Sequence, residues 1–240
     1  MIEYSIIVKK KIGESMRARF VFSNVLICLT VLTSVFFGTV IAVDPMQQLQ
    51  EGNRRFANNT SANTSLSQKE REKLATGQTP FATIVACSDS RVPPEIIFDQ
   101  GAGDLFIVRL AGNTVDEFAL ASIEYGISYL RTPLLVVMGH ANCGAVKAAF
   151  NLKEGEFSPK LTALLKNIEP AVKQAIDQNP GKSQEELVDI AIKLNAQNVL
   201  KEITDRVPAV KELKDKGKLS VNTGVFQFET GKVEWQSDEA

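Results

Sequence analysis

Two apolar runs, each followed at once by thiol or imidazole side chains, constrain the fold of this chain more than any other feature. Residues 81–86 are almost all apolar and lead into Cys87, and residues 133–139 lead into His140 and Cys143. Apolar runs of this length are typical of strands that are covered on both faces of a parallel sheet. Because the carboxyl ends of neighbouring parallel strands meet at one edge of a sheet, we expect the two thiols and the imidazole to lie together.

The rest of the chain alternates between strand and helix patterns. Further strands are predicted at 104–109, 219–228 and 232–235. Helices are predicted at 45–58, 67–76, 94–98, 114–130, 144–152, 158–178 and 184–206, with Thr114 and Glu117 as a capping box at the start of the fourth. This order predicts an α/β fold with a mainly parallel central sheet, about four parallel strands and an antiparallel edge strand, flanked by helices.

The N-terminal residues have the layout of a targeting segment. Basic side chains precede an uncharged stretch at 20–43, which includes the small-residue cleavage pattern Val40-Ile41-Ala42. We therefore expect a signal peptide at 1–42, with Met1 or Met16 as the start, followed by one catalytic domain at 43–240. The protein would then be exported to the periplasm or another extracytoplasmic space. If residues 20–43 are not cleaved, they are long enough to form a membrane anchor.

Charge and cysteine content argue against two classes of protein. The chain has 27 basic and 28 acidic side chains and a formal net charge of −1, which argues against a nucleic-acid partner. The three cysteines do not form a disulfide framework, because Cys28 lies in the N-terminal apolar stretch and the other two have a better explanation.

The better explanation is a metal site. Zinc prefers thiolate and imidazole ligands, and Cys87, His140 and Cys143 supply three of them. Structural zinc sites usually close with four protein ligands, whereas catalytic sites keep the fourth position for water or substrate. A strand-end cysteine or a lone histidine is usually structural when taken singly. In combination, these residues predict one catalytic Zn²⁺ per chain.

Asp89 and Arg91 give such a site two states. If Arg91 holds the Asp89 carboxylate in a bidentate pair, the metal keeps a place for water and lowers its pKa towards about 7. If zinc instead captures Asp89 as a fourth ligand, no water binds and the site is silent.

The double motif Cys-x-Asp-x-Arg and His-x-x-Cys, in an α/β pattern of this length, resembles the beta-class carbonic anhydrases. The resemblance runs from about Asp44 to Trp235. It implies zinc on the two cysteines and the histidine, Asp89 and Arg91 as the dyad that orients a zinc-bound hydroxide, and reversible hydration of carbon dioxide to bicarbonate and a proton. It also implies a homodimer or higher homo-oligomer, with the helix at 45–58 laid across its neighbour and the active site at the subunit interface.

The resemblance extends to the substrate side of the site. Gln78 matches a glutamine whose amide contacts substrate in plant-type members, Phe106 and Tyr125 match the aromatic pair that lines the pocket, and the Gly144 backbone N–H can meet the substrate oxygen. Carbon dioxide is then expected to lie against Phe106, Tyr125 and Ala111. Without the family, each side chain has an ordinary role in a turn, a core or a helix.

Two positions depart from the family pattern. Members that favour the Asp-bound state carry a tryptophan three residues before the first ligand; Ile84 stands there, which predicts the open, plant-type site. Leu110 replaces the asparagine that more often follows the arginine, Arg109.

Other functions are possible for this set of residues. Hydrolases of carbonyl sulfide or carbon disulfide resemble the same family and use the same ligands. A catalytically silent zinc-binding homologue is a further alternative, but it would not need the Asp89–Arg91 pair. An alcohol-dehydrogenase-like enzyme needs a dinucleotide fingerprint, which is absent.

Overall fold

The computed structural model describes residues 43–62, 66–153 and 155–236; the expected targeting segment at 1–42 lies outside them. One sheet has the strand order β2-β1-β3-β4-β5. Its strands are β1 Ala82–Cys87, β2 Leu105–Leu110, β3 Leu134–His140, β4 Ser220–Phe226 and β5 Val233–Gln236. Strands β2, β1, β3 and β4 run parallel to one another, and β5 is antiparallel to β4. The predicted α/β class, with four parallel strands and an antiparallel edge strand, is confirmed.

Helices connect the strands and cover the sheet. They are α2 Pro45–Ala57, α3 Gln68–Leu74, α4 Pro94–Ile97, α5 Glu117–Glu124, α6 Gly144–Phe150, α7 Pro159–Gln178, α8 Gln184–Arg206 and α9 Pro208–Asp215, with a short 3₁₀ segment η1 at Ala111–Asn113 and a π-helical segment η2 at Tyr125–Tyr129. Within the described residues, no helix is long and apolar enough to cross a membrane.

The predicted helix at 114–130 differs from the observed one at its start, whereas at its end α5 continues as η2 to Tyr129. Asp116 is the N-cap of α5 and accepts a hydrogen bond from the Ala119 N–H, whereas the Thr114 hydroxyl donates to the Ala111 carbonyl. The capping box of Thr114 and Glu117 was therefore wrong, because the residues before α5 are used to build η1. The sequence pattern also missed α9: Pro208 stands at its first position, where proline begins a helix as readily as it ends the preceding one.

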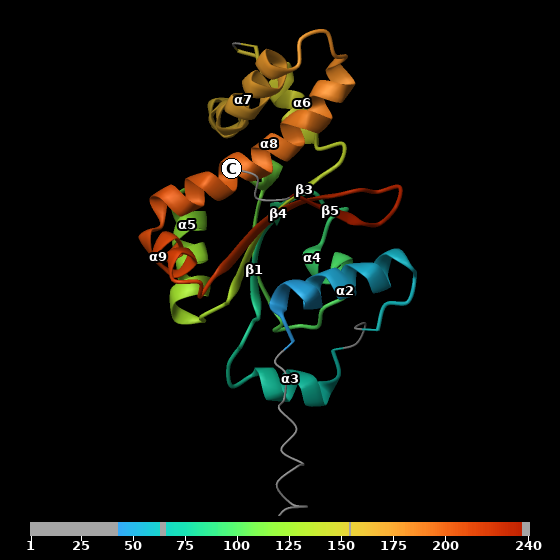
Figure 1. The fold of residues 1–240 in the computed structure, drawn as a ribbon, viewed down its shortest axis with the longest axis vertical. Helices are drawn as coiled ribbons and strands as arrows, with labels where there is room; N and C mark the ends of the chain where they lie inside the picture. Colours follow the sequence, from blue (N-terminus) through green and yellow to red (C-terminus); the bar gives the residue numbers. More distant parts are fainter. Residues whose placement is uncertain (1–42, 63–65, 154, 237–240) are drawn as a thin grey trace, which may run out of the picture. The chain divides into compact units, whose positions relative to one another are not determined.

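Alternate residues of the central strands point into two apolar cores. Ile84 of β1 and Val136 of β3 belong to the core that contains Leu49 of α2 and part of α4. Val85 and Val137 belong to the other core, which contains residues of α5, α9 and the second half of α8. Figure 1 shows α2 and α4 on one side of the sheet and α5 and α9 on the other. Burial on both faces explains why β1 and β3 are apolar throughout.

One face of α2 is held by its own chain. Gly52 lies so close to α4 that a Cβ atom there would be 1.8 Å from the Phe98 carbonyl oxygen, so only glycine fits. The buried Asn53 amide donates to the Ile97 and Gly231 carbonyls and accepts from the Val233 N–H. Arg55 forms an ion pair of 2.5 Å with the buried Asp99 carboxylate. These contacts fix α2 against α4 and the β4–β5 turn.

Candidate metal centre

The three predicted zinc ligands meet at the carboxyl edge of the sheet. Cys87 is the last residue of β1, His140 is the last residue of the adjacent β3, and Cys143 is the N-cap of α6. All three are buried, and their ligand atoms lie within 4.8 Å of one another. A tetrahedral zinc ion with ordinary Zn–S and Zn–N bonds would hold such atoms about 3.5–3.8 Å apart, so a small contraction suffices.

The turn between His140 and Cys143 brings the second thiol back to the cluster. Asn142 has a φ of 57°, a left-handed conformation that asparagine tolerates better than most residues. Its side-chain oxygen accepts a hydrogen bond of 2.8 Å from the Lys147 ammonium group. The left-handed turn at Asn142 therefore explains how a thiol only three residues after His140 can return to the same cluster.

The histidine is oriented as a metal ligand. His140 Nδ1 lies 2.9 Å from the Ala141 carbonyl oxygen, so this nitrogen is the donor and Nε2 carries the lone pair. Within the part of the chain that the structure describes, Nε2 is buried and has no hydrogen-bond partner. A buried imidazole nitrogen without a partner, beside two thiols, fits a metal such as zinc.

The two thiols share one proton when no metal is bound. A hydrogen bond from Cys143 lowers the pKa of Cys87 to about 4, and the backbone N–H groups of Asp89 and Gly112 act in the same direction. The contact with Cys87 raises the pKa of Cys143, and burial adds to that rise. A metal ion would take the place of this proton.

We expect a pH dependence of the metal-free protein from this pair. Between about pH 4 and pH 8.5 the folded chain holds one thiol proton fewer than the unfolded chain, so stability rises with pH; above pH 8.5 the unfolded chain holds fewer protons, and stability falls. Urea unfolding at pH 5, 7, 8.5 and 10 checks the sign. A double Cys87→Ala, Cys143→Ala variant is the control, and an identical pH profile for it would contradict the shared proton.

Asp89 and Arg91 form the predicted bidentate pair beside this cluster. Arg91 Nε and Nη2 donate to the two Asp89 carboxylate oxygens at 2.9 and 2.7 Å, and the Arg91 backbone N–H donates at 3.0 Å. These hydrogen bonds hold the pKa of Asp89 well below its usual range. Asp89 Oδ2 lies 3.8 Å from His140 Nε2, so the carboxylate faces the ligand cluster without bonding to the imidazole.

Two further residues support the dyad, and sequence reasoning assigned them no role. The Arg91 guanidinium lies 4.5 Å from the centre of the Phe228 ring. The Phe228 and His140 rings are nearly perpendicular, with their centres 5.9 Å apart. Arg109 donates to the carbonyls of Cys87 and Asp89 at 2.8 and 2.6 Å. The signal for Arg109 was a charged residue in an otherwise apolar strand.

Leu110, which stands where the family more often has asparagine, acts through its backbone and packs its side chain in a core. The Leu110 carbonyl accepts a hydrogen bond of 3.1 Å from the Ser88 N–H, and its side chain packs on the core below α5. Residue 110 therefore supports the Cys87–Arg91 loop through its backbone.

Comparisons with known proteins agree with this geometry. The sequence profile of the carbonic anhydrase family matches residues 82–233. The carbonic anhydrase of Synechococcus elongatus is 34% identical over 200 residues, which cover 78% of this chain and 70% of that protein. The solved structure of the beta-carbonic anhydrase CcaA is 28% identical, covers 81% of this chain and 92% of that one, and superposes with a TM-score of 0.67. The chain belongs to the beta-carbonic anhydrase family.

Other family members match over a smaller share of their length or of this chain. Carbonic anhydrase 2 of Mycobacterium tuberculosis is 54% identical over 101 residues, 42% of this chain and 49% of that protein. The chain thus matches about half the length of this mycobacterial relative. A structure from work on two tetrameric beta-carbonic anhydrases of Sordaria macrospora is 27% identical, covers 70% of this chain and 85% of that one, and has a TM-score of 0.63.

The substrate-side residues expected for this beta-carbonic anhydrase fall into two groups. Ala111 directly follows β2 beside the cluster, and Gly144 begins α6 with open space where a Cβ would be. Phe106 and Tyr125 contact each other, with ring centres 6.0 Å apart, but Phe106 pairs with Thr83 while Leu110 pairs with Cys87. Phe106 is therefore four residue steps from the level of Cys87, about 13 Å along the sheet. Gln78 is exposed and precedes β1, whose other end carries Cys87.

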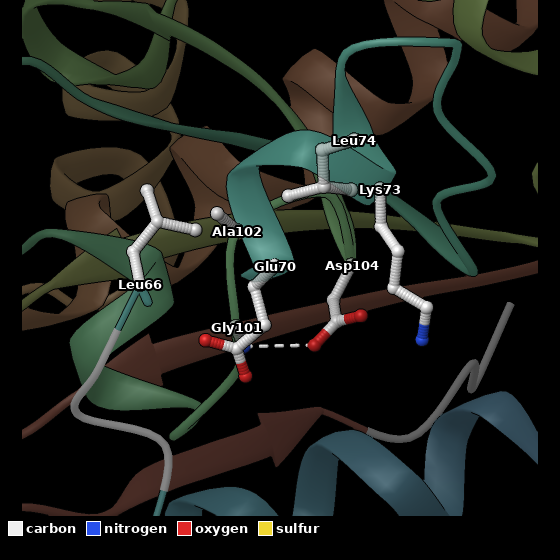
Figure 2. A pocket seen from close by; sticks show the side chains of 7 residues that line it. All are labelled: Leu66, Glu70, Lys73, Leu74, Gly101, Ala102 and Asp104. Carbon is white, nitrogen blue, oxygen red and sulfur yellow. Dashed lines mark hydrogen bonds between the residues drawn. The ribbon is translucent and has the colours of Figure 1, made fainter. Parts of the chain in front are cut away.

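A separate hollow of about 250 Å³ in this family member lies between α3 and the turn before β2 (Figure 2). Both acidic side chains of its lining already accept hydrogen bonds from nearby backbone N–H groups. Asp104 accepts a hydrogen bond from the Gly101 N–H at 2.7 Å, and Glu70 accepts from the Ser67 N–H at 2.7 Å as part of a capping box. The lining contains neither cysteine nor histidine, so this hollow does not resemble the metal centre.

Proposed function

We propose that this protein catalyses the reversible hydration of carbon dioxide to bicarbonate and a proton, with one Zn²⁺ per chain. The observation that carries the proposal is the meeting of Cys87, His140 and Cys143 with an ionised carboxylate facing them, 3.8 Å from the histidine nitrogen. Three protein ligands leave a coordination position open, as catalytic zinc sites do.

The metal ligands and the residues around them have different roles in this proposal. Cys87 Sγ, Cys143 Sγ and His140 Nε2 would hold zinc, which supplies a water molecule with a pKa low enough to make it a nucleophile near neutral pH. Asp89, whose carboxylate faces the cluster, would accept a hydrogen bond from this water and so orient it. Arg91 keeps the Asp89 carboxylate ionised and prevents it from turning towards the metal. Arg109 fixes the loop that carries both, through the Cys87 and Asp89 carbonyls.

We assign the resting site to the open state, in which Asp89 is not the fourth zinc ligand. The bidentate contact with Arg91 supports this assignment, as does Ile84, which is fully buried in β1 where other members carry tryptophan. An open site turns over at pH 7 as well as at pH 9. Turnover at pH 9 alone would mean that Asp89 occupies the metal at neutral pH.

The working unit in this proposal is a homodimer or higher homo-oligomer whose second copy brings Gln78, Phe106 and Tyr125 to the metal centre. Within one chain Phe106 lies level with Thr83, about 13 Å along β1 from Cys87, and Tyr125 packs against Phe106, so the register does not bring the pair to the metal centre. The surface beside the pair supports an interface, since Phe118 and Tyr129 are 84% and 75% exposed, and β2 is the edge strand of the sheet. Light scattering with size-exclusion chromatography measures the state, and a fully active monomer would contradict it.

Export remains part of the proposal. The basic and apolar pattern of residues 1–42 supports a periplasmic or other extracytoplasmic location, and an anchored protein if residues 20–43 are retained. Cell fractionation and N-terminal sequencing of the mature protein test both forms.

Stopped-flow hydration of carbon dioxide tests the activity. Residues 43–240 would be assayed at pH 7 and pH 9 with zinc determined on each sample, and carbonyl sulfide and carbon disulfide would be tested as alternative substrates. Rapid hydration with zinc bound supports the proposal. Full zinc occupancy without hydration would contradict it, and turnover of a sulfide substrate instead would identify a hydrolase of the same fold.

A further inference from the structure

The Cys87 sulfur receives hydrogen bonds from two backbone N–H groups. The Asp89 N–H, 3.4 Å away, belongs to the same loop as Cys87, whereas the Gly112 N–H, 3.2 Å away, comes from η1 after the neighbouring strand. Groups that hydrogen-bond to a metal ligand orient it and adjust how strongly it binds the metal. The conformation of Gly112 therefore bears directly on the first ligand.

Gly112 adopts a conformation that the chain must hold in place. Its φ of 67° and ψ of 23° are left-handed, a backbone conformation that is strained for residues other than glycine, and a Cβ atom would lie 2.6 Å from Ile168 Cδ1 and 3.2 Å from Ala145 Cβ. Glycine has the greatest backbone freedom of any residue, and its own preference does not select this conformation. A contact from outside η1 is needed to select it.

Asn195 of α8 makes that contact. Its Nδ2 donates a hydrogen bond of 2.8 Å to the Gly112 carbonyl, across 83 residues of sequence. The asparagine is 1% exposed, and its side-chain oxygen has no hydrogen-bond partner among the described residues. A buried amide that satisfies only half of its polar atoms adds little net stability. The side chain does hold the carbonyl of the same residue whose N–H lies on the Cys87 sulfur.

We infer that Asn195 is a positioning residue for the metal centre: it holds the Gly112 carbonyl so that the Gly112 N–H stays on the Cys87 sulfur. This inference rests on the proposed zinc site and adds a residue to it that lies outside both motifs. Loss of the Asn195 amide frees Gly112 to rotate and weakens the hydrogen bond to the sulfur. Cys87 then becomes a more electron-rich and less well-placed ligand.

The test compares Asn195→Leu with Asn53→Leu as a matched control. Asn53 is equally a buried asparagine, 5% exposed, whose amide donates to backbone carbonyls, but its partners lie in α4 and the β4–β5 turn. Each protein would be loaded with Co²⁺, to record the thiolate-to-metal absorption in the near ultraviolet, and with Zn²⁺, to measure the rate of metal transfer to a coloured chelator.

In Asn195→Leu we expect the cobalt–thiolate band to move to longer wavelength and zinc release to accelerate by about tenfold or more, with neither change in Asn53→Leu. An unchanged band and release rate in Asn195→Leu would overturn the inference, and so would equal changes in both variants. If Asn195→Leu does not fold, Asn195→Ser replaces it, because the shorter serine side chain cannot reach the Gly112 carbonyl and does not crowd the site. The same absorption band and release rate are then measured, with the same interpretation. A wild-type chain that binds neither metal would refute the zinc function itself, whereas metal binding without hydration leaves this comparison valid.

Discussion

Replacement of Cys143 by serine is expected to abolish zinc binding at ordinary metal concentrations and to remove carbon dioxide hydration with it. Serine is nearly the same size, but its hydroxyl is a poor zinc ligand at neutral pH, whereas the thiolate is a preferred one. Mutation of a residue that only hydrogen-bonds to a metal ligand typically lowers metal affinity by about 10–100-fold. Loss of the ligand itself should therefore lower zinc affinity by more than about a hundredfold. Metal analysis of the purified variant and stopped-flow hydration measure the two effects.

The control for this variant is Ser88→Ala, which changes an exposed side chain in the same region and leaves both thiols in place. Circular dichroism separates loss of the ligand from loss of the fold, since Cys143 caps a helix of only seven residues and makes no side-chain hydrogen bond to it. A folded Cys143→Ser protein with one zinc per chain and wild-type turnover would remove Cys143 from the ligand set.

The strands that carry the ligands could be predicted because their signal is local. β1 and β3 are buried on both faces, so their residues before the ligands Cys87 and His140 are apolar or small, and the motifs mark their ends. The N-cap of α5 could not be chosen in this way. Thr114 and Asp116 both precede suitable residues, and only the packing of η1 consumes the Thr114 hydroxyl.

The residues around the ligands were harder to predict because sequence separates them from the motifs. Arg109 reaches Cys87 across 22 residues, Phe228 comes from the turn after β4, and Asn195 comes from the middle of α8. Arg109 stands out only as a charged residue in an apolar strand, and the other two positions have no pattern that distinguishes them from an ordinary aromatic or helix residue. Their roles follow from the register of β1 with β2 and from the packing of α8 on η1.

The same register separates Phe106 from the metal centre within one chain. Family resemblance placed this aromatic in the substrate pocket, but residue 106 pairs with the start of β1 and the ligand lies at its end. In the proposed oligomer, a second copy of the chain brings this aromatic to the metal centre.

The largest effect expected without loss of the metal comes from Asp89→Asn. Asparagine has the same shape but cannot carry the negative charge that Arg91 holds in place, and its amide can donate where the carboxylate only accepts. The nucleophilic water would lose the group that orients it. We expect kcat/KM for hydration to fall by about 10²–10⁴ at pH 8 with zinc still bound, and Asp116→Asn, at the cap of α5, should be near wild type.

Arg91→Gln separates the two roles of the pair. Without the guanidinium, the Asp89 carboxylate is free to compete with hydroxide for the fourth zinc position, and a higher pH favours hydroxide. Hydration by Arg91→Gln should therefore be low at pH 7 and recover as pH rises towards 9, whereas Asp89→Asn should stay low throughout because its orienting charge is gone. Parallel pH–rate profiles for the two variants would show that Arg91 does not act by holding Asp89, and a fully active Asp89→Asn would show that the carboxylate does not orient the nucleophile.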